Sequence, residues 1–167
     1  KKIILLIGYF RPSKNYELII EVMPKILERY PEAILVLAGK IRGTEHIEYR
    51  KMLFELIERS PAKEYIYVIR GQLPQHIFDT ILSASDIVAL PYKITSQSGI
   101  MAHCLAFGRP VVTSGGEAME NLINESRAGL ICSDADSYVE NIVKILSDPD
   151  LSKQFSENAR RYVKKYI

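Results

Sequence analysis

Two basic residues in the segment "GYFRPSKN" (8–15) have types and spacing suited to holding an anion. Arg11 and Lys14 lie three positions apart, and Pro12 stiffens the turn between them. Lys14 stands at the start of an expected helix, where a cation gains nothing from the helix dipole unless both act on a shared anion. The alternative interpretation is a solvated basic loop. The segment has neither the glycine spacing of a dinucleotide fingerprint nor the pattern of a P-loop.

A second segment, "TSQSG" (95–99), opens another expected helix. Ser96 or Ser98 could cap this helix, and Gly99 would let a ligand approach the backbone closely. If both helix starts face the same edge of one sheet, together they could neutralise a pyrophosphate without a metal ion. Taken alone, the segment fits a well-capped core helix equally well.

Groups able to perform acid–base or nucleophilic chemistry are scarce. His103 lies in the apolar run 100–107, where a core histidine bonded to backbone is favoured over a ligand or a base. Glu117 and Glu120 are the only carboxylates on an expected ligand loop. The other two histidines are isolated and are expected to be exposed: His46 and His76. The sequence therefore predicts a protein that binds an anion and has few catalytic groups.

The elements that must position these loops alternate between strand and helix along the whole chain. Short apolar or β-branched runs predict strands at 2–8, 33–39, 65–71, 86–91, 110–114 and 128–133. Helical spacing predicts helices at 15–30, 45–60, 73–85, 100–107, 116–124, about 134–147 and about 151–166. Pro24 should kink the first helix, and the second should turn five residues inward: Tyr49, Met52, Leu53, Leu56 and Ile57. The pattern predicts an α/β, Rossmann-like, doubly wound parallel sheet of about six strands, which binds ligands outside the carboxyl ends of its strands.

Composition limits the class of protein. The 167 residues, 47% hydrophobic and 25% charged, are typical of one globular domain covering 1–167. A net charge of +2 gives no support for a nucleic-acid partner. No apolar stretch approaches the ~20 residues of a membrane span. Cys104 and Cys132 lie in apolar segments and are expected to be buried thiols. The chain opens on Lys1 with a core strand directly behind it, which suggests a domain excised from a longer protein.

Several segments occur together in an order that resembles one family. They include "IGYFRPSKNYELII", "VIRGQLP", "LSASDIVALPY", "TSQSGIMAHCLAFGRPVV" and "GGEAMENLI". In this order they resemble the C-terminal domain of a retaining, family 4 (group 1) glycosyltransferase of the GT-B fold, over nearly all of the chain. The resemblance implies that this domain binds a nucleotide-diphosphate sugar, with UDP or GDP as the expected nucleotide. It also implies an N-terminal acceptor domain that the chain lacks.

The resemblance implies roles for particular residues. Lys14 matches the lysine that contacts the donor phosphates, and Arg11 substitutes for an arginine expected at the position of Tyr9. Ser98 and Gly99 match the helix start that holds the pyrophosphate. The loop carrying Gly71 and Gln72 is expected to meet the base.

The same comparison reveals a departure at the sugar and ribose positions. Most members carry two glutamates eight positions apart, and here Thr95 and His103 stand in those places. Thr95 could bond a sugar hydroxyl, and His103 could contact the ribose or simply pack. Gln97 and Glu117 complete the expected sugar or ribose contacts, and no residue is assigned as catalytic.

The expected reaction of the whole protein is transfer of a glycosyl group to an unknown acceptor with retention of configuration, without a metal or other cofactor. The resemblance favours a cytoplasmic enzyme of polysaccharide or glycolipid synthesis, and the missing domain could touch the inner face of the membrane. Two alternatives remain. One is a degenerate nucleotide-binding or regulatory module, and the other is a nucleotide-sugar 2-epimerase of the same fold.

Overall fold

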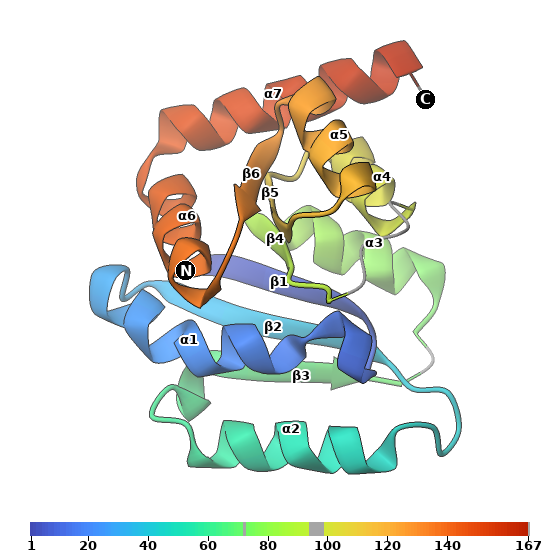
Figure 1. Cartoon of the computed structure of the whole chain (residues 1–167), viewed down its shortest axis with the longest axis vertical. Coiled ribbons are helices and arrows are strands. Elements are labelled where there is room, and N and C mark those ends of the chain that lie inside the picture. The colour runs from blue at the N-terminus through green and yellow to red at the C-terminus, as the bar shows by residue number, and fades with distance from the viewer. Residues whose placement is uncertain (72, 94–98, 167) are drawn as a thin grey trace.

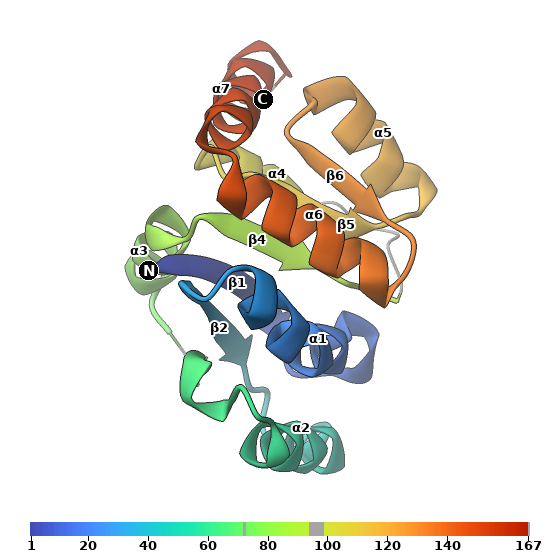
Figure 2. The same cartoon turned by 90° about the vertical axis from the view of Figure 1, so that its left-hand side faces the viewer.

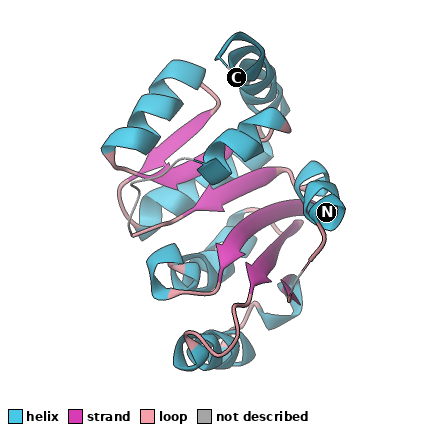
Figure 3. Ribbon diagram, turned by 90° about the vertical axis from the view of Figure 1, so that its right-hand side faces the viewer, coloured by secondary structure: helices cyan, strands magenta, loops and turns pink. Residues whose placement is uncertain are grey.

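Six strands form one sheet at the centre of this computed structural model, which describes residues 1–71, 73–93 and 99–166 (Figure 1). The strands are β1 (Lys2–Tyr9), β2 (Ala33–Lys40), β3 (Ile66–Arg70), β4 (Ile87–Leu90), β5 (Val111–Ser114) and β6 (Gly129–Cys132). They pair in the order β3-β2-β1-β4-β5-β6, and every pair is parallel. The arrows in Figure 3 accordingly point to one edge of the sheet. The predicted α/β fold with a doubly wound parallel sheet is confirmed.

Helices connect the strands and cover both faces of the sheet. The α-helices are α1 (Tyr16–Arg29), α2 (Ile47–Arg59), α3 (Gln75–Ala84), α4 (Gly99–Ala106), α5 (Glu117–Ser126), α6 (Ala135–Ser147) and α7 (Pro149–Tyr166). Two short 3₁₀ helices are η1 (Pro12–Lys14) and η2 (Lys63–Tyr65). Helices α1, α2 and α6 pack in one core cluster on one face, and Figure 2 shows α1 and α6 in front of the sheet. Helices α3, α4 and α5 bury their apolar side chains in a second cluster on the other face. The strands read as continuous apolar runs because both faces are covered.

One expectation about the second helix needs correction. Met52 does not turn inward, because its side chain is 39% exposed. Helix α2 buries Tyr49, Leu53 and Ile57, which are four residues apart, and Met52 lies one residue off that stripe. Helix α1 runs from Tyr16 to Arg29 with Pro24 inside it, and the kink at this proline stays a prediction.

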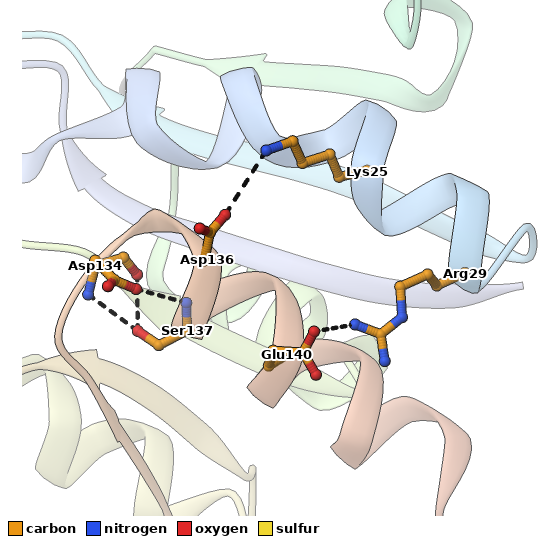
Figure 4. Close-up of polar contacts among 6 residues, drawn as sticks. All are labelled: Lys25, Arg29, Asp134, Asp136, Ser137 and Glu140. Carbon is orange, nitrogen blue, oxygen red and sulfur yellow. Dashed lines mark hydrogen bonds and ion pairs between the residues drawn. The ribbon is translucent and has the colours of Figure 1, made fainter.

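Polar contacts fasten α6 to α1 and fix its first turn (Figure 4). Asp134 accepts a hydrogen bond from the backbone N–H of Ser137 at 2.8 Å, and the Ser137 hydroxyl accepts one from the Asp134 N–H at 3.0 Å. This capping box satisfies two otherwise unpaired donors. Arg29 and Lys25 of α1 form ion pairs with Glu140 and Asp136 of α6. Asp134 is therefore the N-cap of α6.

The order of the strands creates a crevice above one pair of neighbours. From β1 the chain proceeds outward to β2 and β3, then returns to β4 on the other side of β1. The connections after β1 and β4 therefore leave the sheet on opposite faces, and a gap opens between them at the carboxyl edge. Within the described residues, no helix is both long and apolar enough to cross a bilayer.

Candidate functional site

A pocket of about 390 Å³ occupies the crevice between the ends of β1 and β4. We call it the carboxyl-edge pocket. Its lining comes from the ends of β1, β2 and β4 and from α3 and α4, and consists of Ile7, Gly8, Tyr9, Lys14, Lys40, Gln75, Phe78, Tyr92, Gly99, Ile100 and His103. Two of these residues are lysines, and no carboxylate is among the described residues of the lining. The pocket therefore favours a negatively charged ligand.

Two buried tyrosines hold the end of β1 that forms the floor of this pocket. The Tyr92 hydroxyl donates to the carbonyl of Ile7 at 2.9 Å, and the Tyr16 hydroxyl donates to the carbonyl of Gly8 at 2.7 Å. Burial raises the pKa of both tyrosines, so that both remain neutral donors. Gly8 has φ +136°, and a Cβ built there would lie 3.4 Å from the Tyr92 hydroxyl oxygen. This backbone conformation favours glycine at position 8. Because glycine has no side chain, the floor of the pocket remains accessible to a ligand.

Lys14 extends its ammonium group into the pocket, where no described residue acts as its counterion. Its Nζ lies 4.1 Å from the centroid of the Tyr92 ring, a cation–π contact. Within the described part of the chain, this ammonium has no ion pair and no hydrogen bond. Burial, and secondarily the charge of Arg11, lower the pKa of Lys14. An anion would relieve both causes, since it would neutralise the partly buried charge.

Arg11 lies beside the pocket and does not line it. The centre of its guanidinium is 4.9 Å from the Tyr9 ring centroid, and its Nε is buried without a hydrogen-bond partner among the described residues. Its charge nevertheless acts on Lys14. The structure thus brings the two predicted cations close together, but only Lys14 reaches into the carboxyl-edge pocket.

His103 is exposed at the pocket wall, so the core histidine expected from the residues alone is wrong. Its side chain is 44% exposed, and its Nε2 lies 3.2 Å from Oδ1 of Asp79 on α3. The same Oδ1 accepts a hydrogen bond from Nε2 of Gln75 at 3.0 Å. His103 lies four residues after Gly99, so it stands one turn along α4 from the helix start. Asp79 therefore supplies a carboxylate just behind two polar side chains of the lining.

The remaining predicted site residues fall in three places. Gly99 begins α4 and lines the pocket. Gly71, with φ +121°, and Glu117, the exposed first residue of α5, do not line it. Gln72, Thr95, Gln97 and Ser98 lie outside the described residues.

Four residues that shape the site were missed by the sequence analysis. Lys40 ends β2, with its Nζ 4.7 Å from the Phe78 ring centroid, and Tyr92 lies two residues after the end of β4. Asp79 and Phe78 belong to α3. A lysine or tyrosine at the carboxyl end of an apolar strand is a signal that could have identified Lys40 and Tyr92.

Neither cysteine is among the described residues that line the carboxyl-edge pocket. Cys104 and Cys132 are buried, as predicted, and burial raises the pKa of Cys104 to about 12 and that of Cys132 to about 11. The thiols are therefore protonated and unreactive at neutral pH. The described residues contain no group of three or more His, Cys, Asp or Glu side chains placed to hold a metal ion.

Comparison with known proteins matches the chain to one protein family. The family model described as "Glycosyl transferases group 1" matches residues 1–162. Among curated proteins, the chain is 24% identical over 166 residues to a putative glycosyltransferase, YtcC, of Bacillus subtilis, covering 98% of this chain and 41% of that protein. It is also 24% identical over 170 residues to D-inositol 3-phosphate glycosyltransferase of Corynebacterium urealyticum, covering 99% of this chain and 39% of that protein. The chain thus spans about two fifths of the length of these relatives.

Solved structures agree on the fold. The C-terminal domain of the group 1 glycosyl transferase LpcC from Francisella tularensis superposes with a TM-score of 0.87 at 18% identity, covering 99% of this chain and 86% of that one. The Anabaena protein HepE, solved in complex with UDP and glucose, superposes with a TM-score of 0.84 at 15% identity, covering 99% of this chain and 44% of that one.

Proposed function

Because the chain belongs to the group 1 glycosyl transferases, we propose that it is the domain that binds the nucleotide-diphosphate sugar in a longer, two-domain retaining glycosyltransferase. The observation that carries the proposal is the Lys14 ammonium, which has no protein counterion among the described residues and lies in a pocket lined by no carboxylate. The position of that pocket, at the switch point of the sheet, is where open α/β folds bind ligands. HepE, with a similar fold, was solved with UDP and glucose, which supports a nucleoside diphosphate as the ligand.

In this proposal the diphosphate binds between Lys14 and the start of α4, where Gly99 and Ser98 are placed by the sequence. The charge of Lys14 and the backbone N–H groups at the start of α4 would stabilise the negative charge that develops on the leaving diphosphate in the transition state. Arg11 would add to the field from beside the pocket. These groups act by position and charge, so this part of the reaction requires no proton transfer.

The nucleoside is proposed to extend from the diphosphate toward α3. The apolar Phe78 ring and the Lys40 ammonium lie on that side, together with His103, Gln75 and Asp79. Gly71 and Gln72 remain proposed for the base, and Thr95, Gln97, His103 and Glu117 for the ribose or the transferred sugar. The acceptor would bind on the N-terminal domain that the relatives' greater length implies.

Calorimetric titration of the 167-residue chain with UDP, GDP and ADP tests this function. We expect one of the three to bind with a Kd between micromolar and low millimolar, and the corresponding monophosphate to bind more weakly. Failure of all three to bind at low ionic strength would overturn the proposal. If one binds but the full-length protein transfers no sugar, the lack of carboxylates among the described residues of the lining favours the second candidate, a nucleotide-binding module without transferase activity.

Replacing His103 with alanine should weaken nucleoside diphosphate binding by about three- to tenfold, since one hydrogen bond contributes roughly 0.5–1.5 kcal/mol. Thermal stability should be unchanged, because the side chain is 44% exposed. His76→Ala, an exposed histidine on α3 outside the lining, is the matched control and should bind normally. A lower melting temperature with unchanged affinity would instead assign His103 a packing role.

A further inference from the structure

A second charged pocket lies at the opposite, amino edge of the sheet. It encloses about 340 Å³, and we call it the amino-edge pocket. The first residue of β1, residues before β4 and β5, the end of α6 and the first turns of α7 line it. The lining consists of Lys2, Asp86, Gly108, Arg109, Pro110, Ile145, Leu146, Pro149, Ser152, Lys153, Ser156, Glu157 and Arg160. Four of these side chains are basic and two are acidic. None of the described residues proposed for the donor site lines this pocket.

Among the described residues, the acidic side chains of this pocket form an ion pair with one of its four cations, Lys2. Asp86 lies 3.7 Å from Lys2 Nζ and also accepts the N–H of Ile3 at 2.7 Å. Considering only the described residues, Lys153, Arg109 and Arg160 form no ion pair within 4.0 Å. The pocket therefore carries an excess of positive charge that the protein does not neutralise.

The fold holds the two arginine side chains near each other. Arg109 is fixed by donation from its Nε to the carbonyl of Phe107 at 2.9 Å and from one terminal nitrogen to the carbonyl of Ser85 at 2.8 Å. Burial, and next the charge of Arg160, lower the pKa of Arg109. Asp86 opposes this effect in part. An anion placed between the partly buried Arg109 and the exposed Arg160 would reduce the repulsion between the two guanidinium groups.

Gly108 allows Arg160 to take up its position. Gly108 has φ +67°, and a Cβ built there would lie 2.8–3.0 Å from the guanidinium of Arg160. The Ser156 hydroxyl donates to the Gly108 carbonyl at 2.6 Å and ties α7 to this turn. Arg160 itself makes no hydrogen bond or ion pair in the described part of the chain. Its guanidinium is thus set against the turn with its donors free.

We infer that the amino-edge pocket is a second anion site, which binds a small phosphate-bearing molecule between Arg109 and Arg160. The Arg160 guanidinium suits phosphate oxygens because it can present two parallel N–H donors. Arg109, whose Nε and Nη1 donate to backbone carbonyls, contributes its charge and its second terminal nitrogen. The volume matches a small-molecule ligand larger than phosphate itself. Among the described residues, this site shares no lining residue with the carboxyl-edge pocket. The inference of a second anion site and the proposed donor binding can therefore be overturned independently.

Site-resolved NMR of the 167-residue chain, titrated with inorganic phosphate and with pyrophosphate at constant ionic strength, tests the inference. We expect saturable shifts of the Gly108, Arg109 and Ser156 amides. Arg160→Gln should reduce the affinity at these amides at least fivefold while leaving shifts at Gly8 and Gly99 unchanged. Lys164→Gln, which removes an exposed charge from the same helix outside the pocket, is the matched control and should bind as the parent does.

Three results would overturn the inference. Shifts that are absent, that also appear with chloride, or that persist in Arg160→Gln would show charge screening or no site at all. A folded Arg160→Gln chain, judged by its unperturbed spectrum, is part of the test; if it unfolds, Arg160→Lys takes its place and should weaken binding through loss of the two-donor geometry. Vesicles containing phosphatidic acid form a separate arm, and binding to them in place of the soluble anions would overturn the assignment to a small molecule.

Discussion

Lys14→Ala should weaken binding of the nucleoside diphosphate by roughly ten- to hundredfold, because a hydrogen bond to a charged group contributes about 1.5–3 kcal/mol. Apart from its cation–π contact with Tyr92, the ammonium has no hydrogen bond or ion pair among the described residues, so its N–H donors are available to the ligand. Calorimetry with the nucleotide that binds the parent chain measures the effect. The fold should be unaffected, because burial and Arg11 both disfavour the charged form of this lysine in the folded chain.

Lys93→Ala is the matched control for this change. Lys93 also follows β4 at the carboxyl edge, but it lies outside the carboxyl-edge pocket and its Nζ is 3.9 Å from Glu17. It should change affinity by less than about twofold, as exposed charges contribute little. Equal losses in the two variants would show that the nucleotide responds to general positive charge and not to Lys14.

The lowered pKa of Lys14 also predicts the pH dependence of binding. The protonated ammonium is the form that attracts the diphosphate, and in the free chain it loses its proton at a lower pH than an ordinary lysine. Affinity should therefore decline as the pH rises into the alkaline range, and the Lys14→Ala variant should lack this decline. The difference between the two profiles isolates Lys14 from other titrating groups.

Local sequence patterns were sufficient to predict the sheet, because each strand is an apolar run covered on both faces and each helix carries its own spacing. The same patterns failed for side chains whose exposure depends on tertiary packing. Met52 satisfies the helical spacing but falls beside the buried stripe of Tyr49 and Leu53. His103 sits in an apolar run, yet α4 is short and turns that side chain to the pocket wall.

The sequence could predict only those site residues that lie on a single loop or at a helix start. Lys14 and Gly99 were identified because each lies at a helix start that sequence can locate. Lys40, Phe78 and Asp79 enter from β2 and α3, and nothing in the linear sequence states that these elements meet the loop after β1. The order of the strands, with β1 between β2 and β4, is what brings them together.

Gly129→Ala should lower the free energy of unfolding by at least about 3 kcal/mol, beyond the usual loss from core overpacking. Gly129 pairs with Val111 in the parallel ladder between β6 and β5. A Cβ built on Gly129 would lie 1.9 Å from the carbonyl oxygen of Val111, which is backbone and cannot rotate away. Relief of this clash requires β5 or β6 to move, and β5 also pairs with β4, the strand that ends at the carboxyl-edge pocket.

Denaturant unfolding of Gly129→Ala beside Gly43→Ala separates this clash from the general effect of adding a methyl group. Gly43 has φ +54° and no described atom within 4 Å of its built Cβ, so alanine there meets only backbone strain of about 1 kcal/mol. Similar losses in the two variants would contradict the prediction. Since Gly129 lies outside the pocket, the folded fraction of Gly129→Ala should bind the nucleotide with parental affinity unless the shift of β5 is passed on to β4. Weaker binding in that folded fraction would show that the β4–β5 pairing sets the geometry of the site.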